Sequence, residues 1–183
     1  CVSEDMNIPN SLTILRILLI PCYIGLLVYG RFNLALIVLV VAGITDALDG
    51  AIARVKNQHT RLGAVLDPLA DKLLLTSGFI TLSLIHVIPS WVTIMVVSRD
   101  VILMLGTAVA HFADLRVDIT PTFVGKGTTF LQLSYIVTVI FLSSRQIDLA
   151  VILPLLFGMV TFTLLSGLHY LYRGIRHTNM ISS

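Results

Sequence analysis

Charge is scarce in this sequence. Charged residues make up 12% of its 183 residues, whereas hydrophobic residues make up 56%. Such a composition excludes an intrinsically disordered chain and argues against an ordinary water-soluble enzyme. The formal net charge is only +2, without the basic stripe of a nucleic-acid binder. We therefore expect a membrane protein with no nucleic-acid partner.

Cysteine is nearly absent as well. The two cysteines, Cys1 and Cys22, stand far apart, so neither a disulfide framework nor a cysteine metal site is indicated. Residues 1–5 precede Met6, and we expect them to be a cloning remnant or disordered. We expect residues 6–177 to form one membrane domain, followed by a tail over residues 178–183.

Long apolar stretches are what the sequence has in abundance. Six of them cover residues 11–30, 33–53, 64–86, 90–111, 126–144 and 149–172. A helix of about 20 apolar residues crosses the hydrocarbon core of a bilayer. We predict an all-α polytopic membrane protein with six transmembrane helices and a short N-terminal interfacial segment over residues 7–16.

The basic residues test this topology independently. With both termini in the cytoplasm, the inner side carries Arg54, Lys56, Arg61, Arg116, Lys126, Arg173 and Arg176, and the outer side carries Arg31 and Arg145. This distribution satisfies the positive-inside rule. We expect a multi-pass protein of a bacterial inner membrane, with the loop between the second and third helices in the cytoplasm.

Four of the ten acidic residues gather in the second and third predicted helices: Asp46, Asp49, Asp67 and Asp71. The first two are three residues apart and the last two four apart, so each pair shares one face of its helix. Burying four neighbouring carboxylates near a membrane is costly, because they repel one another and lose hydration.

Two interpretations of the aspartates are open. They are either helix-end residues that pair with Arg54, Arg61 and Lys72, or ligands of a hard divalent ion, with Mg²⁺ first, Mn²⁺ next and Ca²⁺ possible. Their common register, with the small residues Gly50 and Ala53 on the same face, favours the metal site. Two ions sharing carboxylates would also suit phosphoryl chemistry.

A longer pattern joins the two pairs. Asp46-Ala-Leu-Asp49-Gly50-Ala-Ile-Ala53-Arg54 is followed by eight residues and then by Gly63-Ala-Val-Leu-Asp67-Pro-Leu-Ala-Asp71. This string resembles the signature of the CDP-alcohol phosphotransferase family, D-x2-D-G-x2-A-R-x8-G-x3-D-x3-D, at every specified position. The opening run with Asn10, Thr13 and Arg16 is similar to that family too.

The resemblance implies a reaction and its site. A substituted phosphate would pass from a CDP-linked donor to an alcohol, and CMP would leave. The resemblance assigns the metal, Mg²⁺ or Mn²⁺ as two ions, to Asp46, Asp49, Asp67 and Asp71, and the role of base to Asp71. It assigns contacts with the CDP donor to Gly50, Ala53, Arg54, Gly63, Asn10 and Thr13. It also implies a homodimer that works among membrane lipids.

The acceptor is less well defined. Arg99 beside Asp100 is open to two interpretations: a structural ion pair, or a group that binds an acceptor phosphate together with Lys126 and Arg116. The Ser98-Arg99-Asp100 string and the Pro121-to-Lys126 segment are more similar to the cardiolipin synthases of the family, which use phosphatidylglycerol and CDP-diacylglycerol. The alternatives are glycerol 3-phosphate, as in phosphatidylglycerophosphate synthases, and an inositol phosphate.

A divalent-cation transporter and a non-catalytic membrane scaffold are the alternatives from other classes. A transporter site is expected near the midplane, between repeated halves of the chain. Here the aspartates cluster toward one side and no repeat is evident, so an enzyme is favoured.

Overall fold

The described residues form six α-helices and one short 3-10 helix. The computed structural model describes residues 8–56, 61–112 and 123–181, with side chains described for residues 14–45, 69–106, 125 and 127–167. The helices are α1 (Ile8–Val28), α2 (Phe32–Lys56), α3 (Arg61–Leu84), α4 (Ser90–Phe112), α5 (Phe123–Ser144) and α6 (Leu153–Ile181), with a short 3-10 helix, η1 (Leu149–Ile152), before α6. These ranges contain no strand, which confirms the all-α prediction for the described residues.

Each predicted apolar stretch corresponds to one helix, with two differences. The last stretch is divided, because Asp148 caps η1 by accepting a hydrogen bond from the backbone N–H of Ala150 at 2.9 Å. The expected interfacial segment is not a separate element, since α1 runs unbroken from Ile8 and includes Pro21. Loss of one backbone donor at a proline is tolerated in apolar helices where neighbouring groups compensate.

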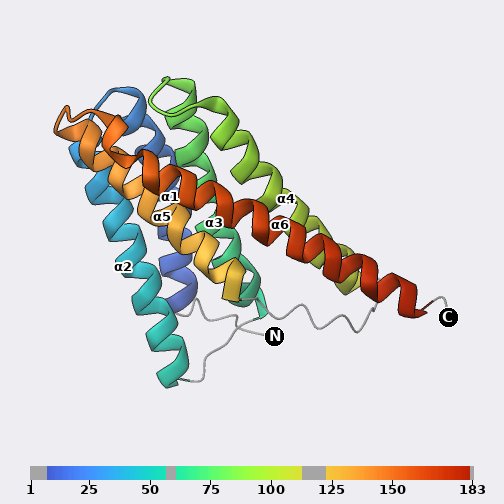
Figure 1. The fold of residues 1–183 in the computed structure, drawn as a ribbon. Coiled ribbons are helices and arrows are strands. Elements are labelled where there is room, and N and C mark those ends of the chain that lie inside the picture. The colour runs from blue at the N-terminus through green and yellow to red at the C-terminus, as the bar shows by residue number, and fades with distance from the viewer. Residues whose placement is uncertain (1–7, 57–60, 113–122, 182–183) are drawn as a thin grey trace.

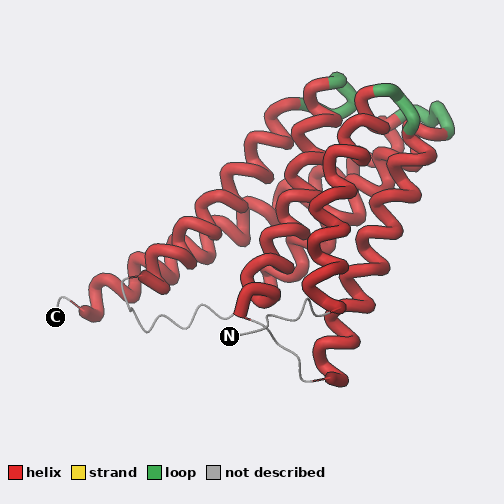
Figure 2. The backbone as a smooth tube through the Cα atoms, turned by 180° about the vertical axis from the view of Figure 1, so that it is seen from behind, coloured by secondary structure: helices red, strands yellow, loops and turns green. Residues whose placement is uncertain are grey.

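The helices form a bundle whose turns lie together at one end (Figures 1 and 2). These turns join α1 to α2, α3 to α4 and α5 to η1. The residue two places beyond each helix end has a left-handed backbone: Gly30 (φ 68°), His86 (φ 59°) and Gln146 (φ 56°). In the first turn the N–H of Gly30 donates to Leu27 and that of Arg31 to Leu26, and the other two turns repeat this pattern. All three are therefore Schellman caps, which satisfy the last carbonyls of a helix.

α3 and α5 lie in the middle of the bundle, because each of them packs against three other helices. α1 packs against α2 and α3, whereas α5 packs against α2, α3 and α6, and α4 packs against α3 and α6. The buried core consists of apolar side chains from all of these helices, including the stacked rings of Phe79 and Tyr135, whose centroids are 6.2 Å apart. Toward the end opposite the turns, α4 and α6 diverge from the other helices (Figure 1).

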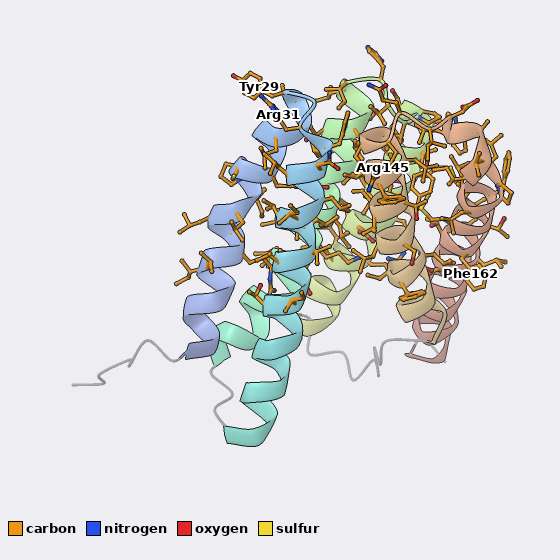
Figure 3. All side chains as sticks on the ribbon, turned by 90° about the vertical axis from the view of Figure 1, so that its left-hand side faces the viewer. Tyr29, Arg31, Arg145 and Phe162 are labelled. Atoms are coloured by element: carbon orange, nitrogen blue, oxygen red, sulfur yellow. The ribbon has the colours of Figure 1, made fainter. Side chains whose placement is uncertain are left out.

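The outside of the bundle is apolar. Large hydrophobic side chains project from it on several helices, for example Phe162 (Figure 3). Leu18 and Ile94 are likewise exposed. By length and composition, two stretches within the described residues can cross a membrane, Gly127–Ser144 and Leu149–Gly167, and Ile14–Val28 and Phe32–Thr45 are shorter apolar stretches. So much exposed apolar surface is typical of contact with lipid or another apolar partner.

Gly78 lets α3 approach its neighbours closely. A Cβ atom at this position would lie 2.5 Å from Cδ1 of Ile136 and 2.7 Å from the hydroxyl of Tyr23, both of which are fully buried. By contrast, a Cβ atom at Gly106 in α4 would meet nothing within 4 Å. The two glycines therefore provide a matched pair, one in a crowded place and one in an open place.

Gly78→Ala should lower the free energy of unfolding by about 1–3 kcal/mol, because the added methyl group overpacks the contact between α1, α3 and α5. Gly106→Ala should leave the stability unchanged or raise it by about 0.5–1 kcal/mol, because alanine favours the helix. Denaturation midpoints of both variants in detergent would measure this difference. Equal midpoints would contradict the packing role of Gly78.

Candidate functional site

The register of the aspartates depends on two helices being continuous. α2 is helical through Asp46 and Asp49, and α3 is helical through Asp67 and Asp71, so the i, i+3 and i, i+4 spacings each define one helical face. The side chains of Asp46, Asp49 and Asp67 lie outside the described side chains. All four positions belong to the halves of α2 and α3 that point away from the three capped turns (Figure 1).

The aspartates lie deeper in their helices than the sequence indicated. α2 continues to Lys56 and α3 begins at Arg61, whereas the apolar stretches predicted an end at residue 53 and a start at residue 64. Asp46 and Asp71 are therefore each ten residues from the helix end, or about 15 Å at the rise of an α-helix. Such depth argues against a mere helix-end role.

Asp71 is paired with a buried arginine from α1. Nη1 of Arg16 donates to Oδ1 of Asp71 at 2.9 Å, and the Arg16 side chain is fully buried, while that of Asp71 is 45% exposed. A charge-assisted bond of this kind orients a carboxylate more firmly than a neutral one. Arg16 thus holds Asp71 from α1, and the Asp71 side chain is partly exposed.

The pairing of Arg16 with Asp71 was not predicted, although Arg16 belongs to the family-like opening run. The signal was present, since an arginine within an apolar helix needs an anion nearby. What the sequence does not contain is the rotation of α1 against α3, which selects Asp71 as that anion.

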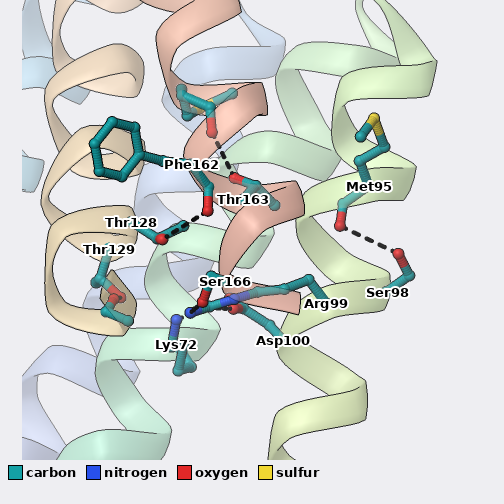
Figure 4. Close-up of polar contacts among 12 residues, drawn as sticks. Lys72, Met95, Ser98, Arg99, Asp100, Thr128, Thr129, Phe162, Thr163 and Ser166 are labelled. Carbon is teal, nitrogen blue, oxygen red and sulfur yellow. Dashed lines mark hydrogen bonds and ion pairs between the residues drawn. The ribbon is translucent and has the colours of Figure 1, made fainter. Parts of the chain in front are cut away.

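A second charged cluster joins α3, α4 and α6 (Figure 4). Asp100 accepts on both oxygens: Oδ2 from Nζ of Lys72 at 2.9 Å, and Oδ1 from Nη1 of Arg99 at 2.7 Å. Nη2 of Arg99 also donates to the hydroxyl of Ser166 in α6 at 2.9 Å. Arg99, Asp100 and Ser166 are buried, whereas the Lys72 side chain is 25% exposed, so the cluster reaches solvent only at the lysine.

This geometry bears on the two interpretations of Arg99. The ion pair with Asp100 is formed, and both terminal nitrogens of Arg99 have partners within the protein. Binding of an acceptor phosphate by Arg99 stays a prediction. The sequence reasoning did not anticipate Lys72 and Ser166 as members of this cluster, because their partners come from other helices.

The remaining predicted residues are located by backbone only, or not at all. Backbone positions within helices are described for Asn10, Thr13, Gly50, Ala53, Arg54, Gly63 and Lys126. Arg116 lies outside the described residues. The roles of all of these residues in binding donor and acceptor stay predictions.

A divalent metal fits the chemistry of the aspartates. Carboxylate oxygens are the ligands that Mg²⁺ and Mn²⁺ prefer, and two helices present four of them in register. Among the described side chains no group of three potential ligands occurs, and of the four aspartates only Asp71 belongs to that part of the chain. The partial exposure of Asp71 is compatible with access by an ion.

The described residues thus form an all-α bundle in which two consecutive helices each have a pair of aspartates in register. The chain belongs to the CDP-alcohol phosphatidyltransferase family, because the model of that family matches residues 6–165. Members of this family use CDP-diacylglycerol and an alcohol acceptor, and they generally depend on a divalent metal.

The relatives of this chain are named for two different enzymes of the family. A Mycobacterium tuberculosis protein named probable phosphatidylglycerophosphate synthase is 32% identical over 177 residues, covering 93% of this chain and 82% of that protein. The human cardiolipin synthase (CMP-forming) is 38% identical over 143 residues, covering 69% of this chain and 48% of that protein. The rat cardiolipin synthase is 39% identical, with 69% and 47% covered. The chain is therefore a phospholipid-synthesising transferase by family.

Arg16→Gln should lower the rate of CMP release by about 100-fold, because Asp71 would no longer be oriented by Arg16 and a small misplacement of a reacting group lowers a rate by about this factor. Arg16→Lys should retain part of the rate, since it preserves the charge but not the guanidinium fork. The assay is CMP release from CDP-diacylglycerol by purified protein. Arg31→Gln, at an exposed position in the first turn, is the control. Activity of Arg16→Gln equal to this control would show that the pairing with Asp71 has no catalytic value.

Proposed function

We propose that this protein transfers a phosphatidyl group from CDP-diacylglycerol to phosphatidylglycerol and releases CMP. The observation that carries the proposal is the family-like signature, in which four of eight specified positions are aspartates. It lies on two continuous helices, and Arg16 binds its last aspartate, Asp71. Phosphoryl transfer needs charge stabilisation and a placed base, and a carboxylate site with bound divalent ions supplies both.

In this proposal Asp46, Asp49, Asp67 and Asp71 hold two Mg²⁺ or Mn²⁺ ions, which would neutralise charge on the reacting phosphate. Asp71 also accepts the proton of the acceptor hydroxyl. Its partly exposed carboxyl group supports this role, because a base must reach the proton that it removes. The bond with Arg16 orients this carboxyl group from α1.

The donor would lie along the same ends of the helices. Family analogy assigns its CDP group to positions on α1, α2 and α3: Asn10, Thr13, Gly50, Ala53, Arg54 and Gly63. Gly50 and Ala53 follow Asp49 in a continuous helix, and their small side chains would leave room for a nucleotide next to the metal. Arg54 would neutralise a phosphate of the donor.

An anionic acceptor is supported by the charge balance around Asp100. Among the described side chains of this cluster, Lys72 and Arg99 contribute two positive charges and Asp100 one negative charge. Nε of Arg99 is buried and has no hydrogen-bond partner in the part of the chain that the structure describes. We propose that Arg99, with Lys126 and Arg116, attracts the phosphate of the acceptor.

Phosphatidylglycerol is our preferred acceptor because identity is higher to the mammalian cardiolipin synthases, at 38% and 39%, than to the mycobacterial protein, at 32%. Glycerol 3-phosphate is the alternative. It is supported by the longer match, 93% of this chain, to a relative named for phosphatidylglycerophosphate synthesis.

We further propose that all six helices span a bacterial inner membrane, with both termini and the aspartates on the cytoplasmic side, and that the protein is a homodimer. The exposed apolar side chains on α1, α2, α4, α5 and α6 support contact with lipid. The basic residues near the same ends of the helices support the orientation.

Asp71→Asn should lower the rate of CMP release by about 10²–10⁴-fold, because the amide cannot accept the proton of the acceptor. Chelation of divalent metal should abolish release by the unaltered protein. Asp148→Asn, which changes the same residue type at the cap of η1 on the other end of the bundle, should leave the rate unchanged. Full activity of Asp71→Asn would contradict the proposed role of Asp71 as the base.

The acceptor can be tested directly. Purified protein with CDP-diacylglycerol and Mg²⁺ or Mn²⁺ should release CMP when phosphatidylglycerol is added, and cardiolipin should form in equal amount. Glycerol 3-phosphate in a parallel reaction should give little release. If only glycerol 3-phosphate supports release, the acceptor is that of a phosphatidylglycerophosphate synthase.

A further inference from the structure

Asp71 and Lys72 are consecutive residues of α3 that face different helices. Asp71 meets Arg16 of α1, and Lys72 meets Asp100 of α4. Consecutive residues of an α-helix point about 100° apart, so α3 can serve both neighbours at once. α3 is packed against both α1 and α4, which agrees with these two side-chain ties.

Lys72 is therefore a cation beside the aspartate signature that does not pair with Asp71 in the structure. Its ammonium donates at 2.9 Å to Oδ2 of Asp100, whose side chain is only 6% exposed. In a low-dielectric interior such a charge needs a close counter-charge. Without Asp100, the nearest fixed anion along its own helix would be Asp71.

Asp100 is itself held from a second side. Its Oδ1 binds Arg99, and Arg99 is fixed in turn by the hydroxyl of Ser166 in α6. If Lys72 turned toward the aspartates of α2 and α3, the carboxylate of Asp100 could not move with it. Such a movement would break the buried ion pair with Arg99, which is strongly unfavourable. This arrangement makes Asp100 a fixed anchor for the lysine.

We propose that Asp100 is a positioning residue whose task is to keep the charge of Lys72 away from the aspartates, so that a divalent cation can bind there. The inference rests on the proposed metal site. Removal of Asp100 alone would leave an unbalanced ammonium next to Asp71, where it repels a divalent ion and competes for the carboxylates. Removal of Lys72 together with Asp100 would take that competitor away.

The test is Mn²⁺ binding by full-length protein in detergent, measured without substrate as the rise of the melting temperature with Mn²⁺ concentration. Asp100→Asn should weaken binding at least tenfold, the lower end of losses seen when groups around a metal site are altered. The double variant Lys72→Met/Asp100→Asn should bind within threefold of the unaltered protein, because it has the same net charge in the cluster. Lys72→Met alone should also bind within threefold.

Thr93→Val is the matched control. Its hydroxyl donates to the carbonyl of Phe79 at 3.1 Å, so it ties the same two helices without charge. This variant should leave Mn²⁺ binding unchanged. A loss of binding equal to that of Asp100→Asn would show that any weakened contact between α3 and α4 disturbs the site, and would overturn the proposal.

Two further results would overturn it. One is Mn²⁺ binding by Asp100→Asn within threefold of the unaltered protein, and the other is a double variant that binds at least tenfold more weakly. If Asp100→Asn alone fails to fold, the double variant provides the test, and binding at least tenfold weaker than that of the unaltered protein would overturn the proposal. Absence of Mn²⁺ stabilisation in the unaltered protein would overturn the metal site as well, whereas CMP release by that protein tests the reaction separately.

Discussion

Charge in the middle of an apolar bundle must be paired, and in this protein the pairs determine how the helices face one another. Arg16 is fully buried and needs Asp71, which orients α1 toward α3. Asp100 is buried and binds Lys72 and Arg99, which ties α4 to α3, and Arg99 in turn binds Ser166 of α6. Apolar contacts with lipid or with other helices are similar in energy, so such polar ties carry much of the specificity of packing.

The sequence predicted the helices well and their mutual rotation not at all. Apolar length located the ends of the six helices within about four residues, because hydrophobicity acts locally along the chain. The exception is the end of α6, which continues to Ile181 although the apolar stretch ends at residue 172. The aspartate register was readable for the same reason, since it lies within single helices. The bonds of Arg16 with Asp71 and of Lys72 with Asp100 join residues 55 and 28 positions apart. No local pattern encodes such partners, because several carboxylates are available to each cation.

For Arg99, the sequence indicates that an anion lies nearby but does not say which one. A lone arginine in an apolar helix indicates an anion, and both an internal carboxylate and a phosphate satisfy that requirement. The structure contains the internal pair, yet a second cation shares the same carboxylate. An internal pair and attraction for an anionic substrate are therefore compatible in one cluster, provided that the positive charge exceeds the negative.

The three capped turns have a consequence for how the chain is made. Each turn satisfies its own backbone groups through the same pair of hydrogen bonds, and each joins helices that are also in contact, α1 with α2, α3 with α4, and α5 with α6. The last carbonyls of the first helix in such a hairpin are therefore paired within the hairpin itself. In the proposed membrane topology, each hairpin can therefore enter the bilayer as a unit, and the later packing of these units brings Arg16 to Asp71.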